Sequence, residues 1–356
     1  MTLILALLTS FVFSIVAVVL LKPLAFHCGL LDTPNARKKH TGSIPLIGGI
    51  AIYIGMLLTT LLFIDTSQEI IIYLFSASII LILGVGDDKM DLSVRGRILI
   101  QVLTALLMTS SAGLYLNELG NIFYFFNFEL GDFGVIVTVF AVITCINAFN
   151  MIDGIDGLAG VLSLITFVSL AILLGLVNSS WVLLPVIFSG SILAYLAFNL
   201  RWPNPSVGKI FLGDAGSMLV GLTIVWLLVI GVEPENQAFR PILALYIIAL
   251  PLMDMAAIMI RRIRKGKSPF EADREHLHHI FERAGFSRKK TLIYISALST
   301  FLVIIGCVFE YFQIAEWMMF LVFCVLFLAF NHALIHSWKI IRWYNAKVKV
   351  KVKANA

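Results

Sequence analysis

Long apolar stretches follow one another along almost the whole chain. Crossing about 30 Å of hydrocarbon takes roughly 20 apolar residues in a helix, and we count eleven such windows, some of them short. The windows cover residues 3–21, 46–64, 70–86, 99–116, 134–149, 158–177, 181–199, 214–232, 241–260, 291–309 and 316–336. Backbone polar groups in lipid must bond to one another, so only helices and closed barrels span membranes, and runs this long exclude a barrel. The sequence therefore predicts an all-α integral membrane protein with about eleven transmembrane helices.

Composition agrees with a membrane protein that forms one domain. Hydrophobic residues make up 60% of the chain, charged residues make up 13%, and the mean hydropathy is +0.98. These values exclude an ordinary soluble domain. Because no internal repeat or soluble insertion is evident, we expect a single polytopic domain over residues 1–356, with a basic cytoplasmic tail at 338–356.

Basic residues predict the orientation of the chain, because short loops rich in Lys and Arg stay in the cytoplasm. Alternate loops differ sharply: one side carries only Arg240, whereas the other carries nearly all remaining Lys and Arg residues. We therefore expect the amino terminus to face outward and the carboxyl terminus to face the cytoplasm. This topology explains the net charge of +5, and since no nucleic-acid-binding module is present, we expect no nucleic-acid partner.

Five polar clusters interrupt the apolar sequence, and all five fall on the predicted cytoplasmic side. Carboxylates beside bilayer segments are unfavourable, so by default they mark function. The clusters are Gly86-Asp87-Asp88, Asn147 with Asn150 to Gly157, Phe211 to Asp214, Arg261 to Lys267, and His276 to His279. The sequence therefore predicts an active site at the cytoplasmic surface.

Three acids in these clusters are candidate metal ligands and candidate bases. The adjacent pair Asp87 and Asp88 is tolerable near lipid when a divalent cation or basic groups compensate it, and one member can serve as a general base. Asp214, at the start of an apolar window, can close a cation site with either of them, and hard oxygen ligands of this kind select Mg²⁺ or Mn²⁺. The alternatives are an ordinary solvated turn for the pair and a helix N-cap for Asp214.

The second cluster combines acids, an amide and glycines. Asp153 and Asp156 are three residues apart, Asn150 precedes them, and the intervening glycines allow a ligand to approach the backbone. A turn of this kind leaves backbone donors for a phosphate or a nucleobase. An EF-hand is excluded because the next residues are apolar and its ligand ladder is absent. A purely structural turn is the alternative.

The histidine cluster, which we define as His276, His278 and His279, follows a basic run. His278 and His279 are adjacent rather than four apart, and no HExxH motif or cysteine accompanies them, which argues against zinc. Imidazole and guanidinium groups suit phosphates, whose charge they offset while a pyrophosphate bond breaks. Positive-inside topology alone already explains much of the basic run.

Taken together, the motifs resemble those of the polyprenyl-phosphate N-acetylhexosamine-1-phosphate transferases. The resemblance covers essentially the whole chain. It rests on Asp87-Asp88, Asn150-x-x-Asp153-Gly154-x-Asp156-Gly157, Phe211-Leu212-Gly213-Asp214 and His276-Leu277-His278-His279, which occur in the family's order. Leu212 replaces a common methionine, a conservative difference. Each motif alone is weak, but four in this order on one membrane face are specific.

The resemblance implies substrates and a cofactor. Peptidoglycan members of the family carry three consecutive histidines, whereas His-Leu-His-His is the form associated with GlcNAc-type donors. The resemblance therefore implies transfer of GlcNAc-1-phosphate from UDP-GlcNAc to undecaprenyl phosphate with release of UMP. This reaction is the first step of O-antigen or enterobacterial common antigen synthesis. Mg²⁺ is the implied cofactor, with Mn²⁺ as a substitute. Inner-membrane lipids and, by analogy, a second copy of the chain are implied partners.

The resemblance also implies roles for individual residues. Asp214 would be the principal magnesium ligand, with Asp87 and Asp88 as the catalytic pair near the lipid phosphate and as further ligands. Catalytic roles also fall on Arg97 and the histidine cluster. Substrate-binding roles fall on His40, Asn150, Asp153, Asp156, Asn199, Phe211 and Arg262. A long segment before Phe211 leaves Asn204 as an alternative to Asn199.

The sequence leaves the reaction route and one competing function open. Attack of the lipid phosphate on the β-phosphorus can occur in one displacement or through a covalent aspartyl intermediate, and either Asp87 or Asp88 can be the base. Another UDP-N-acetylhexosamine donor or another polymer is compatible with the motifs. A secondary transporter or flippase is the competing class, but the acids cluster at one face rather than at the midplane, and no paired broken helices mark inverted repeats.

Overall fold

The computed structural model describes residues 1–33, 42–234, 237–269 and 276–336. His40 and the predicted tail at 338–356 therefore lie outside the described residues. The elements are α1 (Thr2–Cys28), β1 (Leu31–Asp32), β2 (Ile44–Pro45), α2 (Gly48–Phe63), α3 (Gln68–Met90), α4 (Val94–Leu106), η1 (Leu107–Ser111), α5 (Phe133–Ile152), α6 (Leu158–Leu176), η2 (Ser180–Val182), α7 (Leu183–Asn199), α8 (Gly213–Val232), α9 (Pro241–Ile247), α10 (Ala249–Arg264), α11 (Leu277–Arg283), α12 (Arg288–Tyr311) and α13 (Glu316–Ile335).

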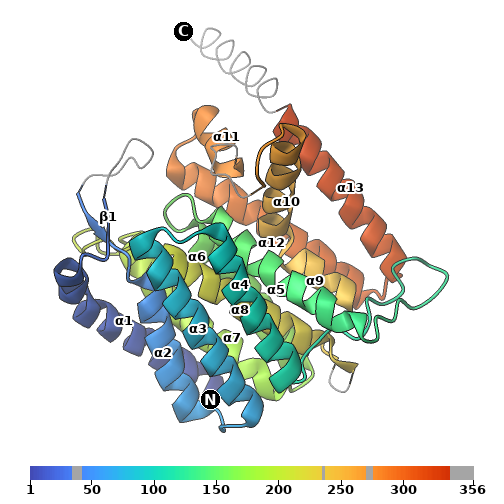
Figure 1. Cartoon of the computed structure of the whole chain (residues 1–356), viewed down its shortest axis with the longest axis horizontal. Coiled ribbons are helices and arrows are strands. Elements are labelled where there is room, and N and C mark those ends of the chain that lie inside the picture. Colours follow the sequence, from blue (N-terminus) through green and yellow to red (C-terminus); the bar gives the residue numbers. More distant parts are fainter. Residues whose placement is uncertain (34–41, 235–236, 270–275, 337–356) are drawn as a thin grey trace.

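The described chain is a bundle of apolar helices (Figure 1). Eight helices in it are long and apolar enough to cross a membrane, and the bent pair α9 and α10 would make a ninth. The all-α multi-pass membrane fold is thus confirmed. All eleven windows coincide with helical segments, but α2 has only 16 residues and α4 passes into the π-helical turn η1. The count of eleven spans and the orientation therefore stay predictions.

Helix α8 forms the centre of the bundle. It is apolar on every side, which predicts burial all round, and the whole of its membrane-length window is buried. It packs against α3, α5 and α2. Small residues allow this close approach: a Cβ added to Gly84 of α3 would lie 2.3 Å from Cα of Ala215 in α8. This contact fixes the start of α8 beside the end of α3.

Helices α9 and α10 form a bent pair. Their axes differ by 79° at the break. Pro251, near the start of α10, has no N–H to donate to the preceding turn, and its ring clashes with the carbonyl four residues earlier. The break places the amphipathic α10 beside α5 and α12. One intramembrane acid, Asp254, lies on α10 and is 1% exposed.

The segment between α1 and α2 is hydrogen-bonded to the residues that lead into α8. Strands β1 and β2 pair antiparallel, with Leu31 opposite Pro45. Beyond them, the Pro45 carbonyl accepts a hydrogen bond from the Phe211 N–H at 2.9 Å, and the Gly48 N–H donates to the Phe211 carbonyl at 2.9 Å. These bonds fasten residues 45–49 to the segment that leads into Asp214.

Candidate active site

The paired acids of α3 meet the first turn of α8. The two oxygens of Asp88 accept from consecutive backbone N–H groups, from Asp214 at 2.9 Å and from Ala215 at 3.2 Å. The first N–H groups of a helix have no partner inside it, so Asp88 caps α8 from a neighbouring helix. Gly213 has φ 72°, and a Cβ there would lie 2.4 Å from Asp88 Oδ2, so only glycine fits this position.

Asp87 faces a different set of donors. Its Oδ2 accepts from Arg97 Nη1 of α4 at 2.6 Å, and its Oδ1 accepts from the Leu92 N–H at 2.8 Å. The Asp87 side chain is 2% exposed, whereas Asp88 is half-buried. Of the two acids, Asp88 is therefore the more accessible to a bound molecule, and Asp87 holds the guanidinium of Arg97 in place.

Amides at the end of α5 complete this junction. Asn150 Nδ2 donates to Asp214 Oδ1 at 2.8 Å and to Ser217 Oγ at 3.0 Å. One turn earlier, Asn147 Nδ2 donates to Gln101 Oε1 of α4 at 2.8 Å. An amide nitrogen carries two hydrogens, and Asn150 uses both to orient the α8 turn. The ends of α3 and α5, the first half of α4 and the start of α8 thus form one hydrogen-bonded unit, which we call the carboxylate end of the bundle.

The carboxylates at this end suit a hard divalent cation. Asp87, Asp88 and Asp214 lie close enough to repel one another. Within the described residues, no three His, Cys, Asp or Glu side chains are arranged to enclose an ion on their own. Mg²⁺ is commonly held by one or two carboxylates, with water and substrate phosphates as its other ligands. The oxygen donors present here fit an ion of that kind.

The loop between α5 and α6 carries Asp153 and Asp156. Burial, followed by the charges of Asp214 and Asp88, raises the pKa of the Asp153 carboxyl to about 7. Asp156 Oδ2 forms an ion pair with Lys209 Nζ at 2.6 Å. The same ammonium group lies 5.0 Å from the centroid of the Phe211 ring, which is within range of a cation–π contact.

The histidine cluster lies against this loop. A Cβ added to Gly154 would lie 2.1 Å from Cε1 of His278. Among the described residues, neither ring nitrogen of the buried His278 has a hydrogen-bond partner. Burial, together with the neighbouring histidines, lowers the pKa of His278 to about 2, so its ring is neutral at physiological pH. Unpaired buried polar atoms are unfavourable, and a bound ligand can satisfy these two.

The other two histidines have acidic partners. His276 Nδ1 lies 2.9 Å from Asp254 Oδ2. His279 Nδ1 lies 3.5 Å from Glu282 Oε2, and its ring centroid is 4.2 Å from that of His278. Partial burial lowers the pKa of His279. The three rings therefore form a contiguous group beside Gly154.

Asn199 and Arg262 support loops around the site. Asn199 is 3% exposed and donates from Nδ2 to the Ile210 carbonyl at 2.9 Å, and its Oδ1 is buried with no partner in the described chain. Asn204 is exposed and bonds within its own turn, so Asn199 is the asparagine that the structure places near Phe211. Arg262 is buried and donates from Nη1 to the Pro269 carbonyl at 2.6 Å.

The structure brings most of the predicted residues together, and it adds Asp254, Lys209 and Ser217. Asp254 had a readable signal, because an acid inside an apolar window is by default functional. Lys209 is one of the basic residues on the predicted cytoplasmic side and belongs to none of the motifs. Ser217 lies one turn after Asp214 in α8, outside the polar clusters of the sequence. His40 cannot be placed because it lies outside the described residues.

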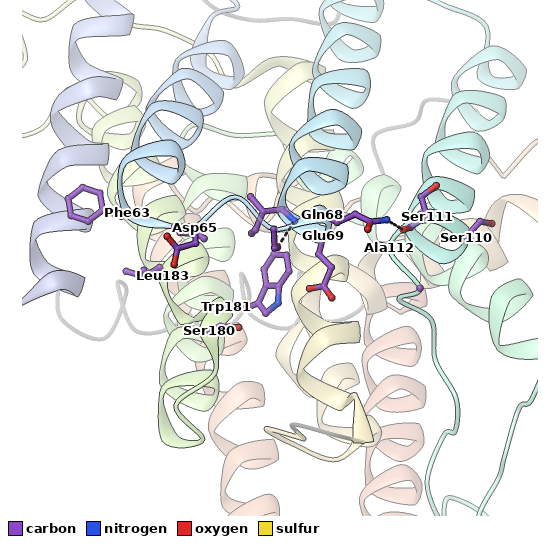
Figure 2. A pocket seen from close by; sticks show the side chains of 14 residues that line it. Phe63, Asp65, Gln68, Glu69, Ser110, Ser111, Ala112, Ser180, Trp181 and Leu183 are labelled. Carbon is purple, nitrogen blue, oxygen red and sulfur yellow. Dashed lines mark hydrogen bonds between the residues drawn. The ribbon is translucent and has the colours of Figure 1, made fainter.

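A cavity of about 830 Å³ lies elsewhere in the bundle, and Figure 2 shows the residues that line it. It is lined by Asp65, Glu69 and Trp181, among others, at the start of α3. Glu69 and Asp88 are 19 positions apart on α3, which corresponds to about 28 Å along the helix. The cavity is therefore at the opposite end of the bundle from the carboxylates.

The chain matches a known class of membrane enzyme. The model of glycosyl transferase family 4 matches residues 70–232. This range runs from α3 to α8 and contains Asp87, Asp88, Asn150 and Asp214.

Three full-length relatives define the family further. All three are undecaprenyl-phosphate alpha-N-acetylglucosaminyl 1-phosphate transferases. The chain is 42% identical to that of Haemophilus influenzae (95% of this chain, 96% of the relative), 43% identical to that of Pasteurella multocida (95% of each) and 38% identical to that of Escherichia coli K12 (98% and 95%). The chain belongs to this family and is a glycosyltransferase-type phosphotransferase, so the resemblance inferred from the motifs is confirmed.

Proposed function

We propose that this enzyme transfers GlcNAc-1-phosphate from UDP-GlcNAc to undecaprenyl phosphate and releases UMP. The observation that carries the proposal is the direct bonding of clusters that are far apart in sequence. Asp88 caps the turn of Asp214, Asn150 bonds to Asp214, and His278 lies on Gly154. The names of the relatives support the same donor and acceptor type.

In the proposed reaction, an oxygen of the lipid phosphate attacks the β-phosphorus of UDP-GlcNAc. The new bond is the pyrophosphate bond to the lipid, and the bond from the β-phosphorus to the bridging oxygen breaks, so that UMP leaves with that electron pair. Positioning and charge neutralisation supply most of the acceleration in phosphoryl transfer. A single displacement needs no covalent enzyme intermediate. Exchange of labelled UMP into UDP-GlcNAc without lipid acceptor would instead reveal an aspartyl intermediate.

We assign different tasks to the two aspartates of α3. Asp88 is half-buried and accessible, so it is the candidate to contact the lipid phosphate and accept its proton. Asp87 is buried and paired with Arg97, so it positions that guanidinium to offset phosphate charge. When bound, Mg²⁺ would neutralise the donor pyrophosphate; Asp214 would be its principal ligand, and the carboxylates of Asp87 and Asp88 would add negative charge beside it. Mn²⁺ is a plausible substitute because it also prefers oxygen ligands.

The remaining site residues are assigned to the donor. We assign Asp153, Asp156 and Asn199 to the uridine nucleotide, because Asn199 bonds to the residue before Phe211, and Asp156 pairs with the lysine whose ammonium group lies over the Phe211 ring. Asn150 orients Asp214. The histidine cluster, with Arg262, suits the sugar and its phosphate, because imidazole and guanidinium groups hydrogen-bond both hydroxyl and phosphate oxygens. His40 is assigned to the same site by family resemblance alone.

The cellular setting follows from the charge asymmetry of the loops. The proposed protein has eleven spans, a periplasmic amino terminus, and an active site on the cytoplasmic face of the inner membrane, where nucleotide sugars are available. Its product would start an O-antigen or enterobacterial common antigen. A homodimer is proposed by family analogy.

Replacing Gly154 with Ala should disturb His278 selectively. The added Cβ would overlap the imidazole, whereas the backbone of Gly154 does not require glycine, because its φ is not positive. We expect about a tenfold loss of kcat/KM for UDP-GlcNAc, the scale of a small misplacement of a binding group. The control is Gly175→Ala in α6, where a Cβ meets Val182 at an ordinary 3.6 Å. Equal activity of the two variants would contradict the placement of His278 in the donor site.

Donor identity is tested by competition. Purified enzyme receives undecaprenyl phosphate, Mg²⁺ and equal amounts of UDP-GlcNAc, UDP-GalNAc and UDP-MurNAc-pentapeptide, and mass spectrometry identifies the lipid product. We expect GlcNAc-pyrophosphoryl lipid. Exclusive formation of another product would mean that the enzyme catalyses the same reaction with a different UDP-sugar as donor. Substrate flux across sealed vesicles without nucleotide release would favour the transporter alternative.

A further inference from the structure

We propose that Asp254 is the positioning residue of the histidine cluster. Its carboxylate lies on α10, the second helix of the bent pair. It fixes both the tautomer of His276 and the position of the first residue of α11. The inference deepens the proposed function and rests on it, because it assumes that the histidine cluster serves the donor site.

The geometry around Asp254 carries the inference. Both carboxylate oxygens are used by adjacent residues of one loop: Oδ2 lies 2.9 Å from His276 Nδ1, and Oδ1 accepts from the Leu277 N–H at 3.0 Å. The Asp254 side chain is 1% exposed and that of His276 is 10% exposed. Charged groups buried this deeply are retained only with good partners. In Figure 1, α11 lies beside α10 at the same end of the bundle.

The chemistry of the contact decides which nitrogen of His276 carries hydrogen. A carboxylate only accepts hydrogen bonds, so Nδ1 of His276 must donate. In the neutral ring, Nε2 then holds the lone pair, and the hydrogen bond on one nitrogen sets the function of the other. Asp254 thus determines what His276 can offer a substrate.

The contacts of Asp254 also position His278. Leu277 is the first residue of α11, and Asp254 holds its N–H. The His276 and His278 rings stack at 5.6 Å between centroids with 16° between their planes. His278 in turn lies on Gly154. A shift at Asp254 would therefore pass through His276 to the ring that faces the nucleotide loop.

The test is Asp254→Asn, which keeps the shape of the side chain. The amide can still accept one hydrogen bond, but its NH₂ group now faces one of two donors, so His276 must present a lone pair at Nδ1 or move. We expect a fall of roughly 10- to 100-fold in kcat/KM for UDP-GlcNAc, with an unchanged KM for undecaprenyl phosphate. Asp254→Glu keeps the carboxylate and should restore part of the activity.

The matched control is Glu310→Gln. Glu310 also uses one oxygen for a side chain and one for a backbone group, with Arg240 Nε at 2.9 Å and Arg240 N–H at 3.2 Å. This pair joins α12 to the start of α9, at the other end of the bent pair from the histidine cluster. Both variants lose one acceptor oxygen, from the buried Asp254 or from the partly buried Glu310, so a loss of thermal stability is expected in both, but Glu310→Gln should keep its activity.

A double-mutant cycle and a spectroscopic readout complete the test. If Asp254 acts through His276, adding Asp254→Asn to His276→Gln should cause no further loss, because coupled residues are not additive. In ¹⁵N spectra, wild-type His276 should be protonated at Nδ1, and Asp254→Asn should shift the hydrogen to Nε2.

The outcomes separate the inference from the proposed function. Full activity of Asp254→Asn, additive losses in the cycle, or equal activity losses in Asp254→Asn and Glu310→Gln would each overturn the inference. Absence of UMP release by wild-type enzyme would instead overturn the proposed function, and the ¹⁵N spectra would then decide the inference alone. If Asp254→Asn fails to fold, an Nε2-protonated neutral His276 in the wild-type protein overturns the inference.

Discussion

Asp214→Asn should reduce UMP release by at least about 100-fold, the scale of losing one electrostatic contact to developing charge. The variant keeps the shape of the side chain and an acceptor for Asn150, which donates to Asp214 Oδ1 at 2.8 Å. It loses the negative charge that would hold Mg²⁺. The measurement is initial rate against Mg²⁺ concentration with purified protein. The apparent Mg²⁺ requirement should rise together with the fall in rate.

The fold should survive this change, since Asp214 repels Asp87 and replacement by an amide relieves that repulsion. Normal yield and an unchanged melting temperature in detergent would show this. Asp65→Asn, at the other end of the bundle beside α3, is the control and should keep normal activity. Near-normal turnover of Asp214→Asn would contradict the proposed role of this carboxylate in Mg²⁺ binding.

Asp88→Asn is expected to have the second largest effect. An Asn side chain has one acceptor oxygen, whereas Asp88 accepts from two consecutive backbone N–H groups of α8. The NH₂ group would face one of them, so the first turn of α8 should shift and carry Asp214 with it. A displacement of about 1 Å can reduce the rate about 100-fold, and loss of a helix cap destabilises by about 1 kcal/mol. Single-turnover rates and thermal melting measure the two effects.

The control for Asp88 is a cap that lies away from the site. Ser67→Ala removes the acceptor for the Ile70 N–H at the start of α3 and should lower stability by a similar amount without slowing the reaction. Because Asp88 and Asp214 act on one turn, their losses should not add in the double variant. Additive losses, or an Asp88→Asn enzyme that is less stable but reacts at the normal rate, would contradict the claim that this cap positions Asp214 for the reaction.

The sequence predicted the fold class because a helix that crosses the hydrocarbon needs about 20 consecutive apolar residues. Each apolar window coincides with a helical segment. The number of helices that cross the membrane was harder to predict from the sequence, because it depends on where individual helices bend or break. Pro251 explains the 79° bend between α9 and α10, but the apolar window 241–260 continues through it without a change in composition. The passage of α4 into a π-helical turn has no comparable sequence signal.

The sequence also predicted which residue types gather at the site, but not which of them touch. Asp88 appeared as half of an acidic pair, and Asp214 as a possible N-cap. The structure shows that Asp88 provides the cap for the turn that contains Asp214. A contact across 126 positions is decided by packing of α3 on α8, which motifs do not encode. The bond between Asp254 and His276, and that between Lys209 and Asp156, arise in the same way.

The most direct test of the account is the identity of the released nucleotide. Purified enzyme is incubated with uridine-labelled UDP-GlcNAc, undecaprenyl phosphate and Mg²⁺, with and without a chelator, and the soluble products are separated by chromatography. The account predicts UMP, released only with both lipid and metal, together with a GlcNAc-pyrophosphoryl lipid. Release of UDP would mean that the bond to the sugar breaks instead of the pyrophosphate bond, and it would contradict the proposed transfer of a sugar phosphate.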